Sequence, residues 1–383
     1  MNELTTPYYI VDEAKLRKNL SLIKSVSERA GVKIIMAFKA NALWKTFGII
    51  SEYCQSSTAS SLNEMRLSLD YLGQDVHAYC PVYTDETIGE FVDGCSHIVF
   101  NSVAQFEKYR EFVSAYNASH CSEKRVSCGL RVNPECSVIE TDIYNPCKPG
   151  SRFGVTAKVL DDTLPAGIEG LHFHCLCEST SYDLEKVLEA FESRFGMLIP
   201  KIKWLNMGGG HLMTKAGYDI DHLVNLLTSF KKKYPWLQLI MEPGSAFTWR
   251  TGDLVTKVLD VVENQGIKTA IIDASFACHM PDCLEMPYKP IISSSRETVD
   301  LQYPTYRIGG NSCLSGDFMG DWSFDEELCP GDELVFEDMN HYTTVKTNMF
   351  NGIHHPSLVL RHTDGSLEML RLFGYEDYRD RMD

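Results

Sequence analysis

The sequence predicts a mixed α/β protein, built from a parallel (β/α)₈ barrel of the TIM type and a C-terminal all-β domain. Two observations lead to this prediction. Between residues 12 and 248, short apolar runs alternate with amphipathic helical stretches, which is the pattern of parallel strands joined by helices. After Gly244, short strand-like runs follow one another without long helices between them, which indicates a second domain of a different kind.

Eight apolar runs have the length of buried strands and are bounded by polar or turn residues. The main alternative for such a pattern is a doubly wound open sheet. In either arrangement the carboxyl ends of the strands meet at one edge, where we expect the functional groups. The eight predicted strands are residues 33–39, 56–60, 75–80, 96–101, 125–132, 167–175, 202–207 and 237–242.

Helices are predicted where apolar residues recur at spacings of three and four. In residues 11–30 the recurring positions are Leu16, Leu20, Ile23 and Val26. The same periodicity predicts helices over residues 61–72, 183–195 and 219–230.

The domain prediction follows from these elements. The barrel is expected over residues 12–248 and the β domain over residues 249–383, joined by an isolated N-terminal strand in residues 1–11. A hairpin turn is expected at Asp364-Gly365. The long irregular stretch 134–152 is expected to be a loop that faces the active site. Strands of the β domain are predicted at 254–262, 270–273, 306–309, 332–337, 343–348 and 358–361.

Composition narrows the class of protein. With 52 acidic and 36 basic residues the formal net charge is -16, and the basic residues are scattered along the chain. This argues against nucleic acid or an anionic membrane as partner and is compatible with a polycationic small molecule. The N-terminus lacks a signal-type pattern, and the thirteen cysteines suit reduced thiols, so a cytoplasmic location is expected. No Cys-x-x-Cys spacing points to a metal site.

Three polar features at predicted strand ends suggest one chemistry. Lys39 alone would be interpreted as a strand-end cation that reaches water. Gly208-Gly209-Gly210 follows the seventh strand, where bare backbone amides can hold a phosphate, and Glu242 ends the eighth strand, where a carboxylate can hold a proton on a ring nitrogen. An amine, a phosphate site and a carboxylate together describe a site for pyridoxal 5′-phosphate.

Six motifs, in this order along nearly the whole chain, resemble the fold-type III pyridoxal-phosphate decarboxylases. This family joins a barrel like that of alanine racemase to a β domain and includes the ornithine and diaminopimelate decarboxylases. The motifs are Phe38-Lys39-Ala40-Asn41, His172-Phe173-His174, Met207-Gly208-Gly209-Gly210, Glu242-Pro243-Gly244, Gly310-Asn311-Ser312-Cys313, and Tyr342 with Phe350-Asn351-Gly352.

Within this family the chain is most similar to the carboxynorspermidine and carboxyspermidine decarboxylases, which form norspermidine and spermidine. Three stretches indicate this branch: 172–178, 273–288 and 310–317. Ser245 stands where the diaminopimelate enzymes place an arginine, and losing that guanidinium makes a substrate with a second distal carboxylate less suitable.

The resemblance implies a role for each matching position. Lys39 would form the Schiff base with the cofactor, and Cys313, from the partner subunit of a homodimer with its active site at the interface, would protonate the carbanion. Of the two histidines on the sixth strand, we expect only His174 to face the cavity and stack on the cofactor ring, with His172 in a core or helix-facing role. Arg131 would lie behind the ring, near its phenolate side or Glu242. The remaining implied contacts are Tyr342 and Gly208, Gly209 and Gly210 at the phosphate, Glu242 and Gly244 at the cofactor, and Glu178, Asp273 and Asp317 at the substrate amines.

Two alternatives remain open from sequence. The chain could decarboxylate diaminopimelate, ornithine or arginine, or it could bind the cofactor without turnover. Asp273 and Asp317 could also be acids that only stabilise loop turns.

Overall fold

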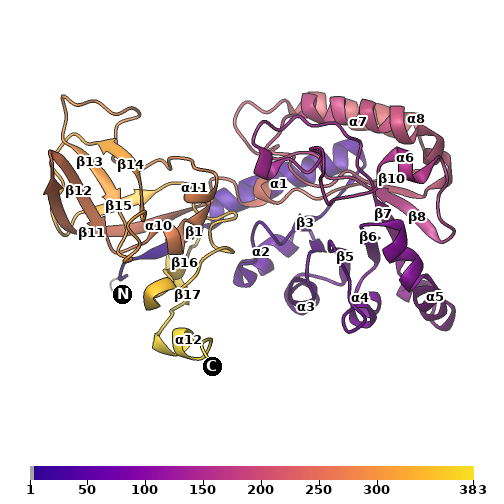
Figure 1. Cartoon of the computed structure of the whole chain (residues 1–383), viewed down its shortest axis with the longest axis horizontal. Helices are drawn as coiled ribbons and strands as arrows, with labels where there is room; N and C mark the ends of the chain where they lie inside the picture. The colour runs from indigo at the N-terminus through magenta and orange to yellow at the C-terminus, as the bar shows by residue number, and fades with distance from the viewer. Residues whose placement is uncertain (1–3) are drawn as a thin grey trace. The chain divides into compact units, whose positions relative to one another are not determined.

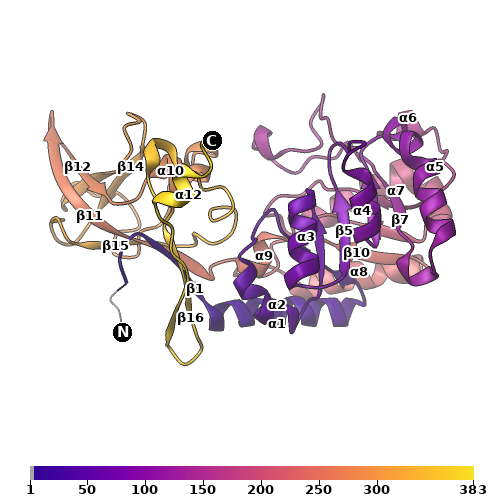
Figure 2. The same ribbon diagram turned by 90° about the horizontal axis from the view of Figure 1, so that it is seen from below.

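The computed structural model describes residues 4–383, which form two compact units. The barrel unit is Arg17–Phe247, and the sheet unit is residues 4–16 together with Thr248–Asp383. In Figures 1 and 2 the strands of the barrel unit are surrounded by its helices. Residues 1–3 of the expected N-terminal strand segment lie outside the described residues.

The barrel unit contains a closed parallel sheet. Among the described residues its segments follow the order β2-β10-β9-β8-β7-β6-β5-β4-β3. β2 (Lys33–Ile34) and β3 (Met36–Ala37) are two halves of one strand, and they pair with β10 and β4 respectively, which closes the ring. The eight predicted barrel strands are therefore confirmed, and the open sheet is excluded. The other strands are β4 (Ser56–Ala59), β5 (Asp75–Tyr79), β6 (His97–Phe100), β7 (Ser127–Arg131), β8 (Ile168–His172), β9 (Trp204–Asn206) and β10 (Gln238–Met241).

Trp204 fills part of the barrel interior. Its neighbours on the adjacent strands are glycines, because a Cβ atom on Gly170 would lie 2.0 Å from the indole and one on Gly129 would lie 2.2 Å from it. The indole Nε1 donates to Ser127 Oγ at 2.9 Å. Small residues facing a large one let the interior reach close packing without voids.

Helices cover the outside of the barrel where the periodicity predicts them. α1 (Glu13–Ala30) buries Leu16, Leu20, Ile23 and Val26. α3 (Leu62–Tyr71), α7 (Ser181–Phe195) and α8 (Ile220–Lys233) begin at side-chain caps from Ser61, Thr180 and Asp219, which satisfy amides of the first turn. The other barrel helices are α2 (Phe47–Ser51), α4 (Ile88–Gly94), α5 (Val103–Ser119), α6 (Ala157–Leu160) and α9 (Ser245–Thr248).

The sheet unit is a mostly antiparallel sheet in the order β14-β13-β12-β11-β1-β16-β17, with β15 also paired to β11. β1 (Tyr8–Asp12) runs antiparallel to β11 and parallel to β16. β16 and β17 form the predicted hairpin, with Gly365 at φ +84°. The other strands are β11 (Gly252–Asn264), β12 (Ile267–Ile272), β13 (Thr305–Gly309), β14 (Phe318–Ser323), β15 (Glu333–Phe336), β16 (Ser357–Arg361) and β17 (Leu367–Arg371).

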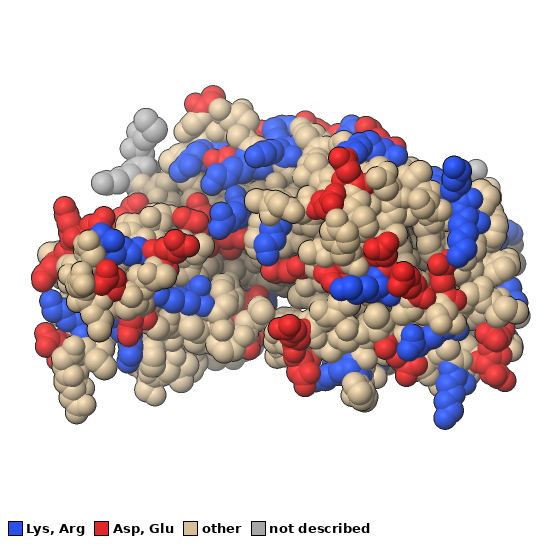
Figure 3. Space-filling model, turned by 90° about the horizontal axis from the view of Figure 1, so that it is seen from above, with Lys and Arg blue, Asp and Glu red and all other residues tan. Residues whose placement is uncertain are grey.

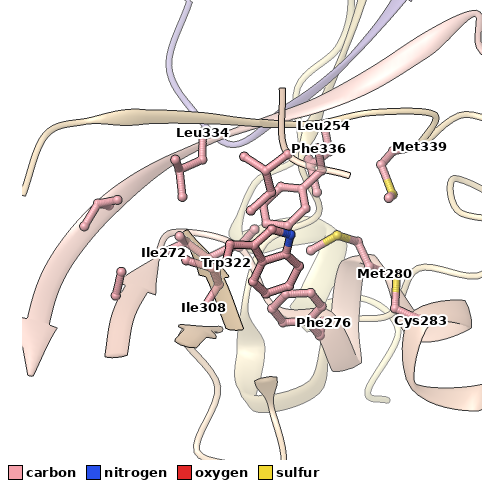
Figure 4. Close-up of a cluster of buried hydrophobic side chains, with 14 of the residues drawn as sticks. Leu254, Ile272, Phe276, Met280, Cys283, Ile308, Trp322, Leu334, Phe336 and Met339 are labelled. Carbon is pink, nitrogen blue, oxygen red and sulfur yellow. The ribbon is translucent and has the colours of Figure 1, made fainter. Parts of the chain in front are cut away.

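The core of the sheet unit packs aromatic rings among aliphatic and methionine side chains (Figure 4). The ring of Phe336 meets the rings of Trp322 and Phe276 edge-on, at centroid distances of 6.4 and 5.8 Å. The indole of Trp322 donates to Pro290 O at 3.2 Å, so its polar atom is satisfied inside the core.

The sequence misplaced some elements of the sheet unit. The strand predicted at 343–348 is wrong, because this segment forms turns in which Lys346 N donates to Thr343 O. β14 was not expected, since Gly320 (φ +84°) and Asp321 disfavour a strand, yet it pairs with β13. The short helices α10 (Phe276–His279), α11 (Pro281–Glu285) and α12 (Tyr375–Arg379) were also missed.

The distribution of charged side chains over the surface is in line with the scattered basic residues of the sequence. Figure 3 shows acidic and basic side chains interspersed over the visible face. Within residues 4–383, no helix has the length and apolar character needed to cross a membrane.

Candidate active site

A cavity of about 630 Å³ opens in the barrel unit at the carboxyl ends of the strands. It is lined by Lys39 after β3, Arg131 at the end of β7, His174 after β8 and Glu242 after β10. The prediction that the polar strand-end residues meet is therefore confirmed for these four. Other lining residues include Ser60, Tyr79, Asp142, Tyr144, Lys148, Arg152, Phe153 and His172.

Lys39 lies in a tight turn that follows β3. Ala40 N donates to Ala37 O at 3.2 Å, and the preceding Phe38 is anchored against Phe47 at 4.8 Å between ring centroids. Gly244 passes so close that a Cβ atom there would lie 2.5 Å from Ala40 Cβ. Gly244 thus supports the turn that presents Lys39.

The Lys39 amine is set up to lose its proton more easily than a free lysine. Its side chain is reached through the open cavity. Desolvation by the surrounding protein, and then the charge of Arg131, lower the pKa of Lys39, while Glu242 acts in the opposite direction. An amine attacks an aldehyde only in its neutral form, so this environment favours a reactive lysine.

Glu242 is buried and ionised. Burial by itself would raise the pKa of Glu242, but contact with His172, a hydrogen bond from Asn206 and the nearby His77 lower it to about 2. Asn206 Nδ2 donates to Glu242 Oε1 at 2.7 Å, and His172 Nε2 lies 3.4 Å from Oε2. The cavity therefore holds a fixed carboxylate that can accept a proton-bearing ring nitrogen.

The expectation that only one of His172 and His174 faces the cavity is wrong, because both line it. Residues two apart on a strand point to the same face. Desolvation lowers the pKa of His172 and lowers that of His174 well below its usual value, so both are neutral at pH 7. The His174 ring is held by the amide of Gly209, which donates to Nδ1 at 2.9 Å.

The triglycine permits very close packing. A Cβ atom on Gly208 would lie 2.4 Å from Phe173 O, one on Gly209 would lie 2.4 Å from Glu242 O, and one on Gly210 would lie 2.2 Å from Leu176 C. The expectation of bare amides is wrong for two of the three. Gly208 N donates to Asn206 Oδ1 at 2.9 Å, and Gly209 N donates to His174.

Arg131 is sandwiched between two aromatic rings. Its guanidinium carbon lies 4.6 Å from the ring centroid of Tyr79 and 4.5 Å from that of Phe153. It also donates to His174 O at 3.3 Å. Phe153 directly follows the irregular stretch 134–152, so Arg131 joins the end of that stretch to the barrel wall.

The loop of residues 134–152 lines the cavity, as predicted. A short 3₁₀ turn at Asp142–Tyr144 contributes Asp142, which pairs with Lys148 at 3.8 Å. Asp142 and Glu242 are the acidic lining residues among those described, and the sequence did not single out Asp142.

Glu178 does not join this group. It is exposed, has a left-handed φ of 47°, and lies outside the cavity lining in the described barrel.

The other predicted site residues lie in the sheet unit. Cys313 is exposed on the connection between β13 and β14, and its amide donates to Asn351 Oδ1 at 2.8 Å. Tyr342 lies in the 341–346 turn with a left-handed φ of 55°.

Both sheet-unit acids are engaged in local structure. Asp317 is buried and accepts from Ala277 N at 3.0 Å and Ser312 Oγ at 2.6 Å, which shapes the turn that carries Cys313. Asp273 accepts from Lys257 N at 2.9 Å and Thr6 Oγ1 at 2.5 Å. These bonds favour the alternative that Asp273 and Asp317 stabilise loop turns.

Three ligand-type side chains also meet at the opposite end of the barrel strands. Ligand atoms of Asp75, His77 and His97 lie within 4.8 Å of one another. The Lys33 amine already occupies this cluster, 2.5 Å from Asp75 Oδ2 and 3.0 Å from His77 Nε2. The ammonium group of Lys33 neutralises the Asp75 carboxylate, so this cluster is an ion pair.

The cavity suits pyridoxal 5′-phosphate. The cofactor brings an aldehyde, an aromatic ring with a basic nitrogen, and a phosphate. The lining offers the amine of Lys39, the imidazole of His174, the ionised Glu242, and the basic residues Lys148 and Arg152. Nδ1 of His172 is buried without a hydrogen-bond partner among the described residues, so the cavity floor still offers one polar atom to a ligand.

Comparison with known proteins gives consistent matches. The family model for pyridoxal-dependent decarboxylase, C-terminal sheet domain, matches residues 8–340. A carboxyaminopropylagmatine decarboxylase of Synechocystis sp. is 45% identical over 384 residues, covering 100% of this chain and 96% of that protein. A carboxynorspermidine/carboxyspermidine decarboxylase of Campylobacter jejuni is 41% identical over 386 residues, covering 98% of each chain.

A solved structure is similar over the full length. The crystal structure of carboxynorspermidine decarboxylase complexed with norspermidine, from Campylobacter jejuni, has a TM-score of 0.89 and 40% sequence identity. The match covers 99% of this chain and 100% of that chain.

Proposed function

We propose that this chain, which belongs to the family of pyridoxal-dependent decarboxylases, removes CO₂ from carboxynorspermidine, carboxyspermidine or both, forming norspermidine or spermidine in polyamine biosynthesis. Pyridoxal 5′-phosphate is the cofactor. The observation that carries the proposal is the meeting of Lys39, His174 and the ionised Glu242 in one cavity.

When bound, the cofactor supplies an aldehyde for an amine and a ring that accepts the electron pair left behind by CO₂. Lys39 provides the amine that holds the cofactor and later reclaims it. Glu242 keeps the proton on the ring nitrogen, and its low pKa keeps it anionic for this task. His174 is assigned to the ring face, in the orientation fixed by Gly209.

The remaining roles are assigned by position in the family motifs. Cys313 returns a proton to the substrate carbon, and Tyr342 with Gly210 contacts the phosphate. Arg131 supports the cofactor from the barrel wall, and Gly244 supports the Lys39 turn. For the polycationic tail we assign Asp142, an acid that lines the cavity, in addition to Glu178, which the family motif suggests although it lies outside the lining.

The assignment of Lys39 is tested by borohydride reduction of the purified, cofactor-loaded protein followed by peptide mapping. Reduction should fix the cofactor on Lys39 and leave Lys148, which also lines the cavity, unmodified. Attachment at any other lysine contradicts the assignment.

A second candidate substrate is carboxyaminopropylagmatine, which the 45% identical Synechocystis relative is named for. Its tail ends in a guanidinium, whereas those of the carboxylated polyamines end in an amine. Measuring CO₂ release from each compound, with diaminopimelate as a further substrate, gives kcat/KM values that rank them. Preference for carboxyaminopropylagmatine would replace the first candidate, and turnover of diaminopimelate alone would exclude both.

We further propose a homodimer in which Cys313 completes the active site of the partner subunit. Mixing the inactive variants Lys39→Ala and Cys313→Ala under subunit exchange should restore about a quarter of wild-type activity, because half of the dimers are mixed and each has one intact site. No recovery despite exchange would place Cys313 in its own subunit's site.

We also propose a cytoplasmic location. All thirteen cysteines are free thiols, which suits a reducing compartment. Cell fractionation against cytoplasmic and periplasmic markers tests it.

A further inference from the structure

Asn206, the last residue of β9, is fully buried and precedes the Met207-Gly208-Gly209-Gly210 motif without belonging to it. Its Nδ2 donates to Glu242 Oε1 at 2.7 Å, and its Oδ1 accepts from Gly208 N at 2.9 Å. A backbone amide can only donate and an ionised carboxylate can only accept, so these partners fix which side-chain atom faces which.

The backbone of Asn206 is held just as firmly. Its carbonyl accepts from Phe173 N at 2.9 Å on one side, and its register partner on the other side is Ile240 of β10. β9 thus lies between β8, which carries His172, and β10, which precedes Glu242, and the Asn206 side chain projects from this paired strand.

Two further hydrogen bonds extend this connection. Glu242 N donates to Gly208 O at 2.7 Å, and Gly209 N donates to His174 Nδ1 at 2.9 Å. Asn206 thus contacts the carboxylate directly and the imidazole through the glycine turn. One side chain therefore links the groups that are assigned to the ring nitrogen and to the ring face of the cofactor.

Aspartate, alanine and glutamine at this position would each disturb at least one of the two contacts. Aspartate would keep the acceptor for Gly208 but set a second negative charge against Glu242. Alanine would leave a buried carboxylate oxygen and a buried amide without their partner. Glutamine is one methylene longer, in a position with no exposed surface.

We propose that Asn206 is a positioning residue, which fixes the orientation of the Glu242 carboxylate and, through Gly208 and Gly209, that of the His174 imidazole. The inference rests on the proposed function for the roles of Glu242 and His174. The contacts themselves do not depend on it.

The test uses Asn206→Asp and Asn206→Ala in the full-length protein. The first readout is carboxylate titration of the cofactor-free protein by ¹³C NMR, with the Glu242 signal assigned from Glu242→Gln. Wild-type Glu242 should stay ionised down to about pH 4, whereas in Asn206→Asp its midpoint should rise by at least about one pH unit, a tenfold change in acidity.

The second readout is the loaded enzyme. We expect kcat to fall at least about tenfold in both variants and the acid limb of its pH profile to move upward in Asn206→Asp, because the ring proton is less well held. Asn206→Ala should also bind the cofactor more weakly, since His174 loses its fixed orientation.

The control is Ser57→Ala, which removes a buried 2.7 Å hydrogen bond to Ser68 away from the cavity. A merely structural role for Asn206 predicts that both alanine variants lose stability alike while the pH profile stays unchanged, and that result would overturn the proposal. If Asn206→Ala does not fold, Asn206→Asp decides, because it retains the oxygen facing Gly208.

The proposal and the proposed function fail differently. A wild-type protein without decarboxylase activity overturns the function, while the titration of Glu242 in the cofactor-free protein still decides whether Asn206 controls it.

Discussion

Nε2 of His172 lies 3.4 Å from Oε2 of Glu242, on a cavity floor where the imidazole is buried and uncharged. This neutral ring gives the carboxylate a polar neighbour on the side opposite Asn206. The pair explains how a carboxylate with little access to water remains ionised.

Replacing His172 with phenylalanine should raise the pKa of Glu242. Burial raises this pKa, and the substitution removes one of the polar groups that lower it. We expect the acid limb of the kcat profile to shift upward by about one pH unit. The matched control is His222→Phe, which removes a similar contact of 3.5 Å to Glu185 on the barrel surface. An unchanged profile in His172→Phe would assign the low pKa of Glu242 to Asn206 and His77.

Stability should fall in mild acid because of His211. Burial lowers the pKa of His211 from 6.5 to about 4, and its Nε2 lies 3.1 Å from Gly208 O. Between these pH values the unfolded chain binds a proton that the folded chain excludes, so the free energy of unfolding decreases as pH falls from about 6.5 to about 4. This group contributes about 3 kcal/mol to that decrease.

Urea unfolding of the cofactor-free protein between pH 4 and 7 measures this effect. His211→Gln should flatten the pH dependence by that amount. His279, whose pKa burial also lowers to about 4, acts in the same direction and leaves part of the slope in place. A slope that His211→Gln does not alter contradicts the assignment.

Gly209→Ala should damage the site by steric overlap. The added Cβ atom would lie 2.4 Å from Glu242 O, although the φ of Gly209 is outside the left-handed region. We expect a loss of about 1–3 kcal/mol in stability and a weaker hold on the cofactor, because the backbone at Glu242 has to shift. Thermal unfolding and cofactor titration measure the two effects.

Gly48→Ala is the control for that substitution. Gly48 lies in α2, where a Cβ atom would meet nothing within 4 Å, so alanine there should be neutral or stabilise the protein by up to about 1 kcal/mol. Equal behaviour of the two variants would show that the close approach at Gly209 can relax.

The sequence predicted the barrel well because its signal is local. Each buried strand is a short apolar run closed by a polar residue, and Lys39 and Glu242 follow such runs directly. In a closed parallel barrel all strands end at one rim, so Lys39 and Glu242, 203 positions apart, can be assigned to one cavity without knowing any contact.

The features of the site that the sequence did not predict depend on side-chain direction and on competition for hydrogen bonds. The period of a strand places His172 beside His174, a signal that was present and misinterpreted. The use of the Gly208 amide by Asn206 has no sequence signal, because a buried asparagine before a glycine turn suits either a cap or a core contact. β14 escaped notice since Gly320 and Asp321 weaken a strand that only its pairing with β13 stabilises.

Arg131 and Phe153 give the last prediction, which concerns the loop of residues 134–152. The Phe153 ring contacts the guanidinium groups of Arg131 at 4.5 Å and Arg152 at 4.2 Å, and Arg131 also lies 4.6 Å from the ring of Tyr79. Arg131 is buried and Arg152 exposed, so the inner contact is shielded from water and should be the stronger one.

Arg131→Lys keeps the charge but loses the planar group that stacks on both rings and donates to His174 O. We expect a loss of about 1–3 kcal/mol in stability and cleavage within residues 134–152 several times faster in limited proteolysis, because the C-terminal end of the loop is released. Arg152→Lys is the control and should change both quantities less, since its guanidinium is exposed and covers one ring. If the two variants are cleaved at the same rate, the loop is held by the hydrogen bonds of Asn101 to Arg152 O and Gly154 N, each 2.9 Å long, and not by the stack.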